Sequence, residues 1–83
     1  MNKYQKKFLF YLEWFYRNYG NTWNINDFPN EISRNTDKIM SLFNDLEDKG
    51  IIQSLGDNLT FKILKLPSET EYAEYVISKN KPK

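Results

Sequence analysis

Side chains that could recognise a polar ligand gather in one short stretch of the chain, SRNTDKIMS. Arg34 and Lys38 offer cationic hydrogen-bond donors, and Asn35 offers an amide that both donates and accepts. Thr36 and Ser41 add hydroxyl groups to the same stretch. The same residue types are also common at any solvated helix start, because Asn and Ser side chains cap helix ends. The stretch is therefore either a binding site or an ordinary capped helix start.

The composition gives little support to catalytic or metal chemistry. The chain has no histidine, the usual proton shuttle at neutral pH and the commonest metal ligand, and no cysteine to bind zinc or form a disulfide. A calcium loop starting at Asp45 would place Gly56 where a bidentate Glu is required. Glycine-rich phosphate loops and nucleophile elbows do not occur either. We therefore expect a protein that is not an enzyme and that needs no metal or cofactor.

Length and composition predict a single domain over residues 1–83, with enough aromatic bulk for a compact core. Three lysines precede an apolar run, as in a secretion signal, but Glu13 interrupts the run and no cleavage site follows. The run is also too short to span a bilayer. We expect a cytoplasmic protein that does not enter membranes. The excess of lysine and asparagine over arginine is typical of AT-rich coding sequence, as in low-GC bacteria and their phages or plasmids.

The first element is a helix over residues 3–19, because apolar residues recur there at helical spacing and Gly20 ends the pattern. Phe10 and Trp14 form a second apolar stripe beside the main one. A helix with two such stripes is too apolar for a single core contact. Something else must therefore cover Phe10 and Trp14.

Two kinds of contact could cover this second stripe. Tyr72, Tyr75 and Val76 form the apolar stripe of a C-terminal helix, which could pack on it within one molecule. Alternatively, Phe10 and Trp14 could meet the same patch of a second copy in a two-fold dimer, with Tyr72 and Tyr75 shared or exchanged. The sequence leaves both arrangements open.

The remaining patterns predict a mostly α-helical fold with a small antiparallel β-hairpin, an α+β arrangement. Ile39, Leu42, Phe43 and Leu46 form the core stripe of a third helix that closes at Gly50. After the first helix we expect a strand at 22–25, a helix at 26–32 capped by Asn26, a polar turn at 33–35 and then the third helix. Strands at 51–55 and 59–66 follow, joined by a turn of Gly56, Asp57 and Asn58. The chain then ends with a helix at 68–79, capped by Ser68, and a frayed tail at 80–83.

This order of helix, strand, helix, helix, hairpin and helix resembles a winged helix-turn-helix domain. The likeness covers residues 3–66 and concentrates in LFNDLEDKGII followed by QSLGDNLTFKIL. These stretches resemble the recognition helix and wing of MarR-like and related small bacterial regulators, where a leucine-rich stripe, a charged pair, a glycine and two branched residues lead directly into the wing. Because the pattern is one of residue classes, it is informative about fold rather than function.

The resemblance implies that the chain binds double-stranded DNA as a transcriptional or mobile-element regulator. Helix-turn-helix proteins place the start of the recognition helix against base edges in the major groove, where Asn pairs with adenine and Arg or Lys with guanine. A homodimer would double the phosphate contacts of a chain whose net charge is only +1. Carried onto this sequence, the DNA-contacting role falls on Arg34, Asn35, Thr36, Lys38 and Ser41, with Lys62 on the wing.

Acidic residues favour an alternative function. Asp45 and Asp48, on the outer face of the third helix, would meet phosphates with like charge. The expected wing tip offers Asp57 where members of the family often present Arg or Lys. The alternative is a protein-binding module on the same fold, an inhibitor or adaptor that uses this acidic face, including Asp37, or the aromatic patch. Its partner would carry a basic surface.

Overall fold

The structure, a computed structural model, describes residues 1–56 and 59–80, with side chains as far as Val76. Within these residues the fold is mixed, with four α-helices and a three-stranded antiparallel sheet. The expected hairpin tip at Asp57 and Asn58, and residues 81–83 of the expected tail, lie outside the described residues. The helices are α1 (Lys3–Asn18), α2 (Asn30–Ser33), α3 (Met40–Asp48) and α4 (Ala73–Asn80), and the 3-10 turns are η1 (Ile25–Asp27), η2 (Thr36–Lys38) and η3 (Pro67–Glu69).

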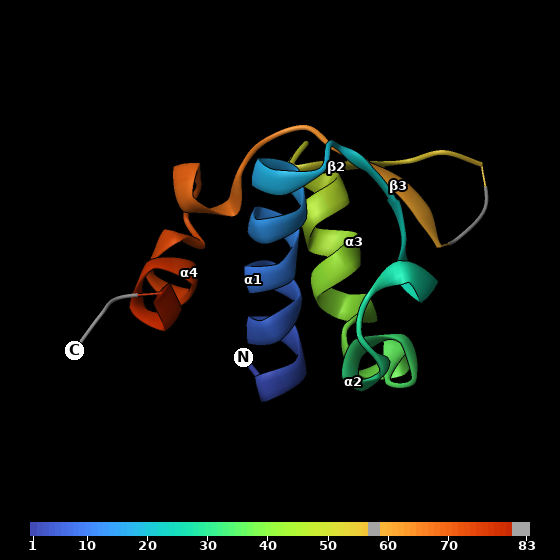
Figure 1. Cartoon of the computed structure of the whole chain (residues 1–83), viewed down its shortest axis with the longest axis horizontal. Helices are drawn as coiled ribbons and strands as arrows, with labels where there is room; N and C mark the ends of the chain where they lie inside the picture. Colours follow the sequence, from blue (N-terminus) through green and yellow to red (C-terminus); the bar gives the residue numbers. More distant parts are fainter. Residues whose placement is uncertain (57–58, 81–83) are drawn as a thin grey trace.

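Helix α1 forms where the sequence predicts it and occupies the middle of the molecule, with α4 on one side and α2, α3 and the sheet on the other (Figure 1). A capping box fixes its start. The Asn2 side chain accepts a hydrogen bond from the Gln5 N–H at 2.8 Å, and the Gln5 side chain accepts one from the Asn2 N–H at 3.1 Å. Beyond its end, Gly20 has a φ of 140°, a conformation that favours glycine.

The predicted hairpin is confirmed, although its strands are shorter than expected. The sheet order is β1-β3-β2, so that the strand following α1 pairs with the second strand of the hairpin. Phe61, in the central strand, is opposite Trp23 on one side and Ser54 on the other. The strands are β1 (Thr22–Asn24), β2 (Ile52–Ser54) and β3 (Thr60–Ile63).

The expected helix over residues 26–32 is replaced by two shorter pieces. Asn24, rather than Asn26, caps the 3-10 turn η1, accepting a hydrogen bond from the Asn26 N–H at 2.8 Å. Phe28 is then extended, with φ −79° and ψ 161°, and α2 begins only after Pro29. The physical reason is the proline, because the residue before a proline is disfavoured in helical conformation.

The third helix begins later than predicted. Residues Thr36–Lys38 form the 3-10 turn η2, Ile39 has φ −113° and ψ −5°, and the α-helix starts at Met40. The predicted core stripe is confirmed, and Gly50 follows the helix with a φ of 73°. The predicted recognition residues therefore lie on a turn and on the first residues of α3, not on one continuous helix.

The C-terminal segment also departs from the prediction. Pro67–Glu69 form the 3-10 turn η3, and α4 begins only at Ala73. Ser68 does not cap a helix. Its backbone N–H and its hydroxyl both donate to the carboxylate of Glu13, at 3.0 Å and 2.8 Å. A contact with a distant helix thus replaces the local cap.

The core is built from phenylalanine rings contributed by different elements. Phe8 of α1 lies with its ring centre 5.3 Å from that of Phe28, 6.2 Å from that of Phe43 and 6.1 Å from that of Phe61. These four rings join α1 to the segment before α2, to α3 and to β3. No helix in the described part of the chain has both the length and the hydropathy needed to cross a membrane.

Candidate nucleic-acid interface

The predicted binding residues of the SRNTDKIMS stretch lie between α2 and α3. Arg34 follows α2 directly and is exposed. Asn35 is half-buried, and its side-chain N–H donates to the backbone carbonyl of Glu31 at 3.0 Å. The Asn35 side chain does not cap the turn η2 that follows it. Its amide satisfies a carbonyl of the preceding helix α2 instead, so only part of it remains for a ligand. Thr36 is half-buried in η2.

Lys38 and Ser41 are exposed and lie against the start of α1. The Asn2 side chain donates to the Lys38 backbone carbonyl at 3.0 Å, and the Gln5 side chain donates to the Ser41 hydroxyl oxygen at 3.1 Å. The Lys38 ammonium is 5.9 Å from the centre of the Tyr4 ring. Sequence reasoning missed this neighbourhood, although Asn2 and Gln5 have the spacing of a capping box.

Positive charge concentrates at this end of the molecule. The Lys3 ammonium is 5.3 Å from the centre of the Tyr4 ring, and Lys6 is exposed one turn further along α1. Lys7 is paired instead, with its ammonium 2.6 Å from a carboxylate oxygen of Glu31, and this hydrogen bond raises its pKa. The start of α1 therefore adds cations to those of the stretch between α2 and α3.

The hydroxyl of Tyr11 donates to the other carboxylate oxygen of Glu31, at 3.1 Å. Partial burial, followed by this hydrogen bond, raises the pKa of Tyr11 above its ordinary 10.0. Glu31 is thus held from α1 by both Lys7 and Tyr11. These bonds fix α2, and with it Arg34, relative to α1.

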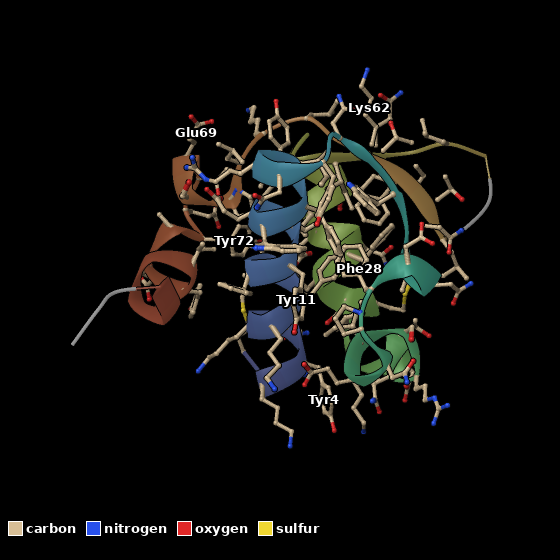
Figure 2. The ribbon with its side chains drawn as sticks, in the orientation of Figure 1. Tyr4, Tyr11, Phe28, Lys62, Glu69 and Tyr72 are labelled. Carbon is tan, nitrogen blue, oxygen red and sulfur yellow. The ribbon has the colours of Figure 1, made fainter. Side chains whose placement is uncertain are left out.

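Lys62 lies away from the other predicted binding residues. It is exposed on β3 opposite Thr22, just beyond the far end of α1. Figure 2 shows Lys62 and Tyr4 at opposite ends of the molecule. A 16-residue helix is roughly 24 Å long, so one ligand would have to be long to touch both Lys38 and Lys62.

The outward side chains of α3 change from polar to acidic along the helix. Ser41 and Asn44 are exposed near its start, and Asp45, Glu47 and Asp48 are exposed towards its end. An anionic ligand would therefore approach α3 at its start.

The described residues contain no group of three or more acidic side chains that could hold a metal ion.

The predicted dimer residues differ in accessibility. Tyr72, which lies between η3 and α4, is only 6% exposed, and both of these elements pack on α1 within the same molecule. Phe10 and Tyr75 are half-buried, whereas Trp14 is 42% exposed. Intramolecular packing thus accounts for Tyr72 and leaves Trp14 as the accessible member of the predicted set.

Sequence reasoning missed the second accessible ring of this patch. Tyr19 is 67% exposed, with its ring centre 5.3 Å from that of Trp14. Its position at the end of the main apolar stripe suggested burial, but it follows the last residue of α1, where helical spacing no longer fixes its direction.

A depression of about 340 Å³ lies beside η3, at the opposite end of the molecule from Tyr4 (Figure 2). Lys49 and Glu71 on its wall are paired with each other at 3.0 Å. Lys49 also donates to the Tyr72 hydroxyl at 3.0 Å, and these hydrogen bonds raise its pKa.

Comparison of the chain with protein-family models, with curated proteins and with solved structures found no match.

Proposed function

We propose that the chain is a small winged helix DNA-binding protein that places the segment from Arg34 to Ser41 in the major groove. The observation that carries the proposal is the two-sided character of this segment. Lys38 and Ser41 are exposed, whereas Ile39 and Leu42, between and beside them, are buried. The polar side chains are thus held outward by a packed core.

The sheet order and the charge distribution agree with this proposal. Strand β1, which follows α1, pairs with β3, the second strand of the hairpin. This pairing ties the expected wing to the helical core. Arg34 and Lys38, exposed between α2 and α3, supply electrostatic attraction for phosphates, which dominates non-specific DNA affinity. The contribution of Lys62 requires a duplex that extends along the molecule to β3.

A homodimer is part of the proposal, because one copy offers few phosphate contacts. Phe10 and Trp14 are its contact residues, with Tyr75 at the edge. Their patch is apolar and lies on the side of α1 away from the Phe8 core. Two copies would present two segments to successive major grooves, about one DNA turn apart.

Fluorescence anisotropy with a labelled AT-rich duplex of roughly 30 base pairs, long enough for two half-sites, tests the function. We expect binding at about 50 mM salt that weakens steeply towards about 200 mM. Arg34→Ala and Lys38→Ala should each cost roughly 1–3 kcal/mol of binding free energy. Lys65→Ala is the matched control, because Lys65 is exposed beside the depression at the other end of the molecule. Absence of binding, or equal losses in all three variants, would exclude the proposal.

A second candidate function rests on the exposed acidic end of α3. Asp45, Glu47 and Asp48 would suit a partner protein with a basic surface. The double variant Asp45→Lys/Asp48→Lys separates the two functions. It should strengthen duplex binding if α3 approaches DNA, and it should remove the complementarity to a basic partner if the chain is an inhibitor or adaptor.

A further inference from the structure

Two ammonium groups from separate elements flank the ring of Tyr4. The Lys3 ammonium is 5.3 Å from the ring centre and the Lys38 ammonium is 5.9 Å from it. Because both distances are measured to the centre of the Tyr4 ring, the separation between the two ammonium groups is at most the sum of the two distances. The aromatic ring attracts each ammonium, so two cations lie near one point of the surface.

Neither of these two cations is balanced by a carboxylate within ion-pair distance among the described residues. The ion pairs among the described residues involve other cations: Lys7 with Glu31, Arg17 with Glu13 and Lys49 with Glu71. Lys3 and Lys38 thus form a pair of like charges without a neutralising group. An anion bound beside them would supply the countercharge that these two lysines lack.

Hydrogen bonds lock the two cation-bearing segments together. The Asn2 amide accepts from the Gln5 N–H and donates to the Lys38 carbonyl, and the Gln5 amide accepts from the Asn2 N–H and donates to the Ser41 hydroxyl oxygen. Each amide thus uses its oxygen within the cap of α1 and its nitrogen towards the start of α3. We call this four-bond arrangement of Asn2 and Gln5 the amide clasp. It fixes Lys3 relative to the segment that bears Lys38.

Lys3 is also an unfavourable residue for its position in the helix. The first turn of α1 contains no acidic residue, and Lys3 is its first residue. The helix dipole favours negative charge there and disfavours a cation. The helix dipole therefore does not favour a lysine at this place, whereas contact with an anionic ligand would.

We propose that Lys3 binds the phosphate backbone of duplex DNA at the edge of the groove that takes Lys38 and the start of α3. The inference rests on the proposed function and adds the start of α1 to the DNA-contacting surface. Lys3 contacts phosphate and carries no base specificity. Asn2 and Gln5 are positioning residues that hold it in place through the amide clasp.

The salt dependence of duplex binding by Lys3→Gln tests this inference, with Lys65→Gln as the matched control. Loss of one phosphate contact should reduce the slope of log affinity against log salt by about 1. Wild-type affinity should therefore fall roughly fourfold more than that of Lys3→Gln between about 50 and about 200 mM salt, equally for AT-rich and mixed duplexes. Lys65→Gln should keep the wild-type slope. The thermal midpoint of Lys3→Gln should be equal to or above that of the wild type, because the helix dipole is better matched.

The possible failures are distinguishable. If the wild type binds DNA and Lys3→Gln keeps its slope, this inference is wrong while the proposed function stands. If Lys65→Gln lowers the slope as much as Lys3→Gln does, the effect is one of net charge and the inference is again wrong. If the wild type binds no duplex at low salt, both the inference and the proposed function fail.

Discussion

Ser68 donates two hydrogen bonds to the buried carboxylate of Glu13, which lies 55 residues earlier in the chain. Glu13 is only 5% exposed, and it also accepts a hydrogen bond from Arg17 at 2.6 Å. A carboxylate is costly to bury unless its oxygens are satisfied, and here three donors satisfy them. This contact holds η3, and the approach to α4, against α1.

We expect Glu13→Ala to destabilise the protein by about 1–3 kcal/mol, because the Ser68 N–H and hydroxyl lose their acceptor in a part-buried setting. Ser68→Ala removes only the hydroxyl bond and should cost less. Urea unfolding measures both free energies, and hydrogen exchange should report faster exchange of the Ser68 amide in Glu13→Ala. Equal stability of Glu13→Ala and the wild type would contradict the assigned role of this carboxylate.

The ring of Phe61 is fully buried at the centre of the sheet. Its ring centre lies 5.4 Å from the ring centre of Phe43 and 6.0 Å from that of Phe28. Phe61→Ala should cost roughly 3–5 kcal/mol, a large part of the stability of a domain of this size. Lys62→Ala, at the exposed neighbouring position, should change the free energy of unfolding by less than about 0.5 kcal/mol. Similar midpoints of urea unfolding for the two variants would show that the side chains of β3 do not alternate as described.

Alkaline pH should weaken the contacts around Glu31. The pKa of Tyr11 is raised above its ordinary 10.0 by burial and by the hydrogen bond to Glu31. The pKa of Lys7 is raised above 10.5 by the same carboxylate. Because both folded-state pKa values are raised, the stabilisation is fully present below the unfolded values and is lost as the pH rises through the folded ones.

The measurement is the free energy of unfolding between about pH 8 and about pH 11, a range that crosses the ordinary pKa values of both groups. Wild-type stability should decline in the upper part of this range. Tyr11→Phe should start lower at the neutral end and decline less, since it lacks the titrating hydroxyl. A Tyr11→Phe profile parallel to the wild type would exclude the Glu31 contact as a source of the pH dependence.

In the proposed homodimer, the exposed ring of Trp14 should be the main contact. Trp14→Ser is expected to raise the dimer dissociation constant roughly tenfold or more, as for an aromatic residue at the centre of an interface. Tyr16→Ser is the matched control, because Tyr16 is an exposed aromatic residue of the same helix but points to nearly the opposite side. Sedimentation equilibrium decides the matter, and a wild-type chain that is monomeric at every accessible concentration would refute the dimer.

The sequence was sufficient for the elements whose pattern is local. The helical spacing of Phe8 and Leu12 predicted α1, and the alternation around Phe61 with a nearby glycine predicted the hairpin. Both patterns reflect burial of one face, which repeats with the period of the element itself. The core stripe of α3 was predictable for the same reason.

Features that depend on tertiary contacts were not predictable in this way. Nothing local indicates that Ser68 binds Glu13 rather than capping a helix, although Glu13 lies four residues after Leu9 and so shares its buried face. The 3-10 turn at Thr36–Lys38 arises where the chain leaves α2. For the candidate site, the sequence supplied the polar stretch but not the contact of Lys38 with the start of α1, which only the packing of α1 and α3 creates.

The proposed DNA-binding surface consists of the segment between α2 and α3 together with the start of α1. Amide chemical shifts recorded while an AT-rich duplex is added at low salt test it directly. We expect the largest changes on residues 34–41 and 2–6, with little change on residues 67–76. Changes concentrated on Asp45–Lys49 or on α4, or no changes at all, would contradict it.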